Sequence, residues 1–136
     1  MLAEMVGVPI LISNIMRDIN FGYTNQLDMF YDLWQKARNE NGEIICPFTG
    51  EVLNGFKHRN NWLTCFAHVL PKGRFTYWKL NPANIRIVYP YFHMAVDQGS
   101  SSDRARHPKW RFDLWDQEVE KLKKEYEEFK INNLLP

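Results

Sequence analysis

The pattern of apolar and polar residues predicts a helix at each side of a middle section made of short strands. Residues 25–38, NQLDMFYDLWQKAR, place apolar side chains at helical spacing, with Asn25 able to cap the first turn and Gly42 beyond the end. This helix is expected to turn one face to the core. The residues of that face are Leu27, Phe30, Tyr31 and Trp34.

A second and clearer helical pattern covers residues 112–130. Its apolar residues step by four, three, four and three positions, which is the a/d stripe of a heptad pattern. The stripe consists of Trp115, Val119, Leu122, Tyr126 and Phe129. Because it covers barely two heptads, packing on the chain's own domain is favoured, and self-association or a partner protein on this helix is the alternative.

Between these helices the pattern changes to short segments. Residues 43–46, EIIC, resemble a strand that enters a turn, and a hairpin or knuckle is expected over the following PFTGEVLNG. Residues 61–69, NWLTCFAHV, and 84–89, NIRIVY, predict two further strands. Residues 91–99, YFHMAVDQG, can form about two helical turns. The polar GSSSDRARHPKW of residues 99–110 is expected to be a mobile loop.

Length and composition complete the structural expectation. At 136 residues, 45% of them hydrophobic, the chain has the size and composition of one globular domain. We therefore expect a single α+β domain over residues 1–136, with a compact core over about 44–99 and flanking helices at each side.

The charge distribution gives the first indication of function. The formal net charge is only +1, but residues 57–111 hold 10 Lys and Arg against 2 Asp and Glu, while both flanking parts are acidic. All four histidines lie in this basic middle, interleaved with aromatic residues. Clustered basic charge is typical of proteins that bind nucleic acid, and an ordinary solvated basic face is the alternative.

Cysteine usage and the N-terminal residues bear on the compartment. The chain has two cysteines, Cys46 and Cys65, and the first twenty residues have neither a basic segment before their apolar residues nor a clear cleavage site. The longest apolar run, residues 8–12, is far shorter than a bilayer span. A cytoplasmic protein without a membrane partner is the expectation.

Four polar side chains of the middle section form a possible catalytic constellation. His68 ends a predicted strand, Asn84 opens the next, and His93 and Asp97 lie one turn apart on the short helix, in the pattern H-x15-N-x8-H-x3-D. Such a site supports phosphodiester hydrolysis, because a neutral imidazole can take a proton from water. Histidine and carboxylate with open positions suit one divalent Mg, Mn, Ni or Zn ion.

These residues resemble a known family. The segment FAHVLPKGRF, followed by LNPANIRIVYPYFHMAVDQG, is similar to the HNH endonucleases, also called His-Me finger or ββα-metal nucleases, over residues 44–99. The resemblance implies a DNA-cutting, metal-dependent enzyme with a ββα-metal core, of the small phage or bacterial type. It implies that His68 is the general base, Asn84 the motif asparagine, and His93 and Asp97 the metal ligands.

The resemblance also implies which basic residues meet DNA. Lys72 and Arg74 follow the general base in the same loop, and a phosphate is expected beside them. Further phosphate contacts are expected from Arg86 in the third strand and from Arg104 and Arg106 in the polar loop.

The chain departs from the family pattern at two places. Ala67 stands where many members have an Asp or His as a further metal ligand. The two CxxC pairs that hold a structural zinc in many members correspond here to Cys46 with Thr49 and Tyr89 with Phe92, so no structural zinc is expected and apolar packing is expected in its place.

Two other classes of function stay open. Ala67 and the missing cysteines would also suit a catalytically inactive, HNH-derived module that only binds nucleic acid. A structural or partner-binding protein that uses the C-terminal stripe is the third reading.

Overall fold

The computed structural model describes residues 19–58 and 61–136 as a mixed arrangement of helices and strands, which confirms an α+β chain. The sheet consists of two antiparallel strands, β1 (Phe66–His68) and β2 (Ile85–Ile87), in which Ala67 lies opposite Arg86 and His68 lies opposite Ile85. The described part of the chain contains no helix of the length and apolarity that a membrane span requires.

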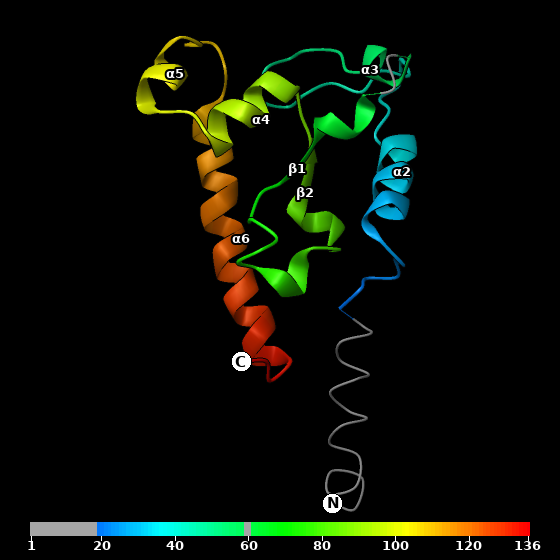
Figure 1. The fold of residues 1–136 in the computed structure, drawn as a ribbon, viewed down its shortest axis with the longest axis vertical. Coiled ribbons are helices and arrows are strands. Elements are labelled where there is room, and N and C mark those ends of the chain that lie inside the picture. The colour runs from blue at the N-terminus through cyan, green and yellow to red at the C-terminus, as the bar shows by residue number, and fades with distance from the viewer. Residues whose placement is uncertain (1–18, 59–60) are drawn as a thin grey trace, which may run out of the picture.

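Helices surround this small sheet. Figure 1 shows the strands between α2 on one side and α6 on the other, with α4 crossing near one end of the sheet. The α-helices are α2 (Gln26–Lys36), α3 (Gly55–His58), α4 (Pro90–Asp97), α5 (Ser101–Ala105) and α6 (Phe112–Asn132). The 3₁₀ helices are η1 (Trp62–Cys65), η2 (Thr76–Trp78) and η3 (Pro82–Asn84).

Helix α2 begins where the sequence predicted, but it turns a different face to the core. The Asn25 side chain caps it by accepting a hydrogen bond of 2.9 Å from the Asp28 amide. The predicted face is wrong in part: Leu27 and Tyr31 are 56% and 55% exposed, while Met29 is fully buried beside Phe30 and Trp34. The buried face therefore consists of Met29, Phe30 and Trp34 and is rotated about the helix axis from the predicted one. Phe30 stacks on Phe66 of β1, with ring centroids 4.2 Å apart.

Two other expectations needed correction. The predicted strand over residues 61–69 is a strand only over β1, because Trp62–Cys65 forms η1, in which the Thr64 hydroxyl donates to the Asn61 carbonyl at 2.6 Å. The expected mobile loop over residues 99–110 contains α5. A capping box between Ser100 and Asp103 begins that helix.

Helix α6 packs its apolar stripe on the chain's own core. Trp115, Leu122 and Tyr126 are at most 5% exposed, and Val119 and Phe129 pack against the same core. The loop between β1 and β2 reaches this helix through Phe75 and Trp78, whose rings lie 5.0 and 5.2 Å from that of Tyr126. The stripe is therefore engaged within the chain.

The predicted turn after residues 43–46 is a tight hairpin joined by a bridge between Ile45 and Val52. Gly50 closes it at a φ of +82°, where a side chain would be strained, and its amide donates to the Cys46 carbonyl. Phe48 points from this hairpin onto Phe92 of α4, with centroids 4.9 Å apart and ring planes 2° from parallel. The hairpin thereby fixes α4 to the core.

Candidate active site

The β1 strand ends at His68, and the loop that follows determines the protonation of its ring. Nε2 of His68 lies 2.9 Å from the main-chain oxygen of Lys79. A carbonyl oxygen only accepts hydrogen bonds, so Nε2 carries the proton in this contact. In the neutral imidazole the lone pair is then on Nδ1, which is the atom that can act as a base.

The surroundings of His68 favour its neutral form. Burial is the largest influence and lowers the pKa of His68 below its ordinary value of 6.5, against the opposing effect of the hydrogen bond to Lys79. The positive charge of Lys72 lowers this pKa further. The Phe30 ring of α2 lies 6.1 Å from the imidazole and contributes to its burial. His68 therefore lies in the protonation state that a general base requires at neutral pH.

Helix α4 supplies the other two polar groups. His93 and Asp97 occupy positions four residues apart, and Nε2 of His93 lies 2.7 Å from Oδ2 of Asp97. Pro90 begins the helix and Phe92, which is fully buried, anchors it, so the two polar side chains lie on a partly exposed face. The side chains of His93 and Asp97 are 27% and 51% exposed.

One open cavity brings these groups together. It has a volume of about 400 Å³ and is lined by His68, Lys72, His93 and Asp97, together with Gln26 and Phe30 of α2 among other residues. Nζ of Lys72 donates a hydrogen bond of 3.3 Å to Oε1 of Gln26, and this contact connects the loop after β1 to α2. The cavity therefore combines a base, a histidine–carboxylate pair and a cation.

The imidazole of His93 and the carboxylate of Asp97 are donor types that divalent ions accept. The 2.7 Å between Nε2 of His93 and Oδ2 of Asp97 is the length of a charge-assisted hydrogen bond, so an octahedral ion, whose adjacent ligand atoms lie about 3 Å apart, would have to replace this contact. In the described ranges no three His, Cys, Asp or Glu side chains gather into one cluster, and Ala67 is fully buried. A metal would thus have two protein ligands and several positions for water or phosphate.

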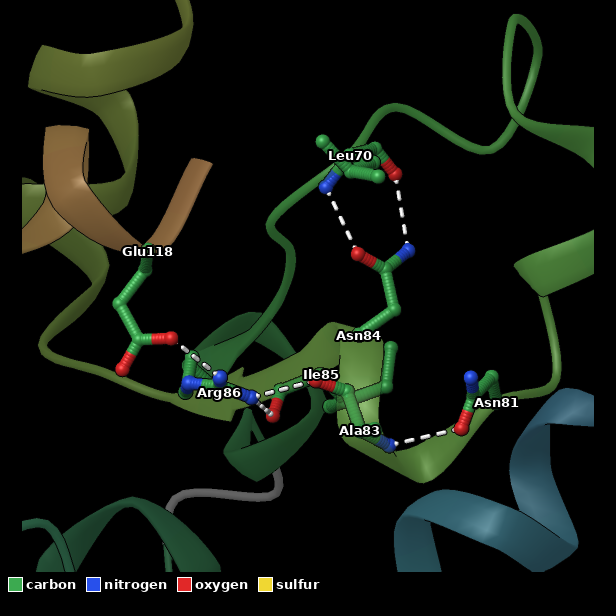
Figure 2. Close-up of polar contacts among 7 residues, drawn as sticks. All are labelled: Leu70, Asn81, Ala83, Asn84, Ile85, Arg86 and Glu118. Carbon is green, nitrogen blue, oxygen red and sulfur yellow. Dashed lines mark hydrogen bonds and ion pairs between the residues drawn. The ribbon is translucent and has the colours of Figure 1, made fainter. Parts of the chain in front are cut away.

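Asn84 lies outside this cavity and holds the loop instead. Its side chain is fully buried and forms two hydrogen bonds with Leu70, accepting from the amide at 2.8 Å and donating to the carbonyl at 2.9 Å (Figure 2). The Asn84 main-chain oxygen also accepts from Val69 at 2.9 Å. Asn84 therefore holds the chain directly after His68 and does not itself line the cavity.

The five basic residues expected to contact nucleic acid lie in different places. Lys72 is in the cavity, whereas Arg74 borders a separate hollow against α6. Arg86 binds Glu118 of α6 at 2.6 Å and two main-chain oxygens (Figure 2). Arg104 forms two hydrogen bonds with Asp116, and Arg106 lies 3.6 Å from Asp103 with most of its side chain exposed.

The hairpin that carries Phe48 is packed with aromatic rings. Phe48 and Phe92 stack on each other, and the Trp115 ring lies 5.5 Å from Phe48. Both cysteines are buried, and burial raises the pKa of the Cys65 thiol to about 12, which keeps it protonated. Aromatic packing thus connects the hairpin with α4 and α6.

Sequence reasoning missed two features of the cavity. Gln26 and Phe30 come from the N-terminal helix, far from the motif in the sequence. The oxygen that binds His68 belongs to the main chain of Lys79, so no residue type could have indicated it.

Comparison with family models, with curated proteins and with solved structures gave no match. The function is therefore argued from the residues and the geometry of this chain.

Proposed function

We propose that this chain is a metal-dependent endonuclease of the HNH type, built on a ββα-metal core, that hydrolyses phosphodiester bonds in DNA. The observation that carries the proposal is the single cavity that His68, Lys72, His93 and Asp97 share. The order of β1, β2 and α4 along the chain fits the ββα core, since both strands and the helix contribute to or support that cavity.

In the proposed reaction His68 accepts a proton from the attacking water through Nδ1, because Nε2 is bound to the Lys79 carbonyl. The water oxygen bonds to phosphorus, the bond to the leaving oxygen breaks, and solvent protonates that oxygen. The ammonium group of Lys72 forms an ion pair with the phosphate. His93 and Asp97 would hold the divalent ion, which when bound neutralises charge on the phosphate and on the leaving oxygen.

A plasmid-nicking assay over Mg, Mn, Ni, Zn and EDTA tests the proposal. Removal of a general base costs about 10²- to 10⁴-fold in rate, so His68→Ala should lose nicking to that extent. His93→Ala should lose the dependence on metal together with most of the activity. His107→Ala is the matched control, because His107 is exposed and stacks on Trp110, outside the cavity.

Nicking that persists unchanged in His68→Ala would contradict the proposal. Gel retardation in EDTA, run on the same proteins, keeps DNA binding separate from cutting.

A binding module that kept the core without hydrolysis is the second candidate. Ala67, fully buried, leaves the metal pair with two protein ligands, which favours this alternative. Retardation of DNA by the wild type and by both variants, without nicking under any metal, would support it over the nuclease.

A further inference from the structure

A second cavity adjoins the candidate active site on the far side of His93. It has a volume of about 520 Å³, and its lining is mainly apolar, with Phe56, Leu63, Tyr91 and Met94 among the residues around it. Leu63, Phe66 and His93 line both cavities. A ligand that occupies the active site can therefore extend directly into the apolar cavity.

The apolar cavity gathers exposed hydrophobic side chains that the fold does not bury. Leu63, Tyr91 and Met94 are 42%, 62% and 57% exposed, and all three border this one hollow. A cluster of exposed apolar residues next to a polar site indicates a binding surface. Tyr91 and Met94 lie three residues apart on α4, on one side of the helix, and His93 lies between them in the sequence.

The chemistry of a nucleic acid fits this division into two parts. Each nucleotide has an anionic phosphate and, one sugar away, a flat base with an apolar face. A phosphate beside Lys72 and His93 would place its neighbouring base within reach of Leu63 and Tyr91. Base faces stack on aromatic side chains with little regard to sequence.

A paired duplex cannot use this cavity. The flat faces of its bases are covered by stacking, and only the backbone and the base edges in the grooves are exposed, so a base face can pack in a hollow beside its own phosphate only after the base leaves the stack. We propose that the apolar cavity binds the unpaired base next to the scissile phosphate, and that the substrate is single-stranded or locally unpaired DNA. This inference rests on the proposed nuclease function.

Fluorescence anisotropy in EDTA tests base binding without any need for hydrolysis. The probes are a labelled single strand, the same strand in a duplex, and an all-abasic strand of equal length and charge. The wild type should bind the single strand more tightly than the other two. Stacking of one base on an aromatic ring corresponds to about 5- to 150-fold in affinity, so Tyr91→Ala should weaken single-strand binding at least about fivefold, with a smaller effect on the abasic strand. Leu63→Ala, which removes apolar contact only, should weaken it in the same direction.

Each variant has a matched control on α2. Tyr31→Ala and Leu27→Ala remove side chains of the same types from positions outside the cavity, where they are 55% and 56% exposed. Both variants should leave single-strand binding unchanged. Thermal unfolding of all four variants shows whether each remains folded.

Binding of the single strand no tighter than the abasic strand would overturn the inference, as would an equal loss for all three probes. Equal losses for the three probes are expected if an apolar segment of a partner protein, and not a base, occupies the cavity.

The cutting assay, repeated with single strand and duplex, separates the nuclease proposal from the base-binding proposal. Equal cutting of both substrates, unaffected by Tyr91→Ala, would reject the base cavity and leave the nuclease standing. Loss of base-dependent binding in Tyr91→Ala, with no cutting by the wild type, would reject the nuclease and retain a single-strand binding site.

Discussion

His68 combines a hydrogen bond to the main chain with a half-buried position, and together these determine the proton position and the charge of its ring. The Lys79 carbonyl places the proton on Nε2, and burial keeps the ring neutral. The positive charge of Lys72 adds to the effect of burial, while the carboxylate of Asp97 opposes it. In the neutral ring Nδ1 therefore carries the lone pair.

The pH dependence of His68 follows from the direction of its pKa. Because the pKa in the folded chain lies below 6.5, the unfolded chain binds more protons in the interval between the two values. The stability that His68 contributes is therefore fully present above pH 6.5 and is lost as the pH falls through the folded pKa. An NMR titration of the His68 ring should show a midpoint below 6.5, and the acid limb of the nicking rate should follow it.

A midpoint at or above 6.5 would contradict the assigned burial. The His68→Gln variant provides the matching stability control, because its unfolding free energy should depend less on pH in this interval.

The site residues differ in how far the sequence could predict them. His68, His93 and Asp97 were predicted together because imidazole and carboxylate groups suit the proposed chemistry and their spacing fits two short elements, and all three line one cavity. Asn84 was predicted to belong to the site, but it does not line the cavity and its side chain binds the Leu70 main chain, a contact that depends on how the loop folds back. The spacing of residues along the sequence does not show that the loop brings the Leu70 main chain to Asn84.

At the scale of elements, the hairpin that carries Phe48 is joined to α4 by stacked rings. Phe48 and Phe92 are 3% and 0% exposed, and Phe92 also stacks on Phe112 at the start of α6, 5.0 Å away. These stacked rings connect the hairpin with α4 and with the start of α6. The position of the hairpin relative to α4 should therefore depend on the size of the Phe48 side chain.

Truncation of this ring is therefore expected to be costly. Phe48→Ala should lower the free energy of unfolding by about 3–5 kcal/mol, because it leaves a cavity among buried rings, and Phe48→Leu should cost less. EDTA should leave the unfolding of His93→Ala unchanged, since this variant lacks a ligand of the proposed active-site ion, whereas a structural metal elsewhere would still contribute to its stability. Urea unfolding with and without EDTA measures both effects, and a stability loss on chelation would show that a metal supports the fold.

Local patterns explain which elements were predicted correctly. The helical stripe of α6 and the cap of α2 are strong signals, and both helices lie close to the expected ranges. Helix α5 was missed although Ser100 and Asp103 have the spacing of a capping box, because the serine-rich composition was given more weight. The strand before His68 was overextended, since β-branched and aromatic residues also occur in η1.

At the scale of the whole molecule, the basic charge of the middle section is partly neutralised by the acidic flanking helix. Arg86 and Arg104 both pair with carboxylates of α6, namely Glu118 and Asp116. Lys72 instead lies in the cavity of the candidate active site, where its Nζ is 3.3 Å from the neutral Gln26 side chain. The formal charge of a segment therefore overstates the charge that is available to a polyanion.

This distribution predicts how binding responds to salt. Each phosphate contact contributes about 0.7–0.9 to the slope of log affinity against log salt, so Lys72→Gln should reduce that slope by about this amount. Arg104→Gln should change it less, because its guanidinium already binds Asp116 through two hydrogen bonds. Anisotropy titrations over a range of salt concentrations give both slopes, and an equal reduction in the two variants would show that the Asp116 pair opens on binding.

The oxygen that fixes the His68 proton has a consequence for how this protein tolerates mutation. Since it belongs to the main chain, nearly every amino acid at position 79 supplies it, and the exposed Lys79 side chain is free to vary. Its position depends instead on the neighbouring Trp78, which is buried against Tyr126 and Phe129 of α6. Saturation mutagenesis of this loop would then give a permissive position 79 beside an intolerant position 78, although the oxygen that His68 binds belongs to the permissive one.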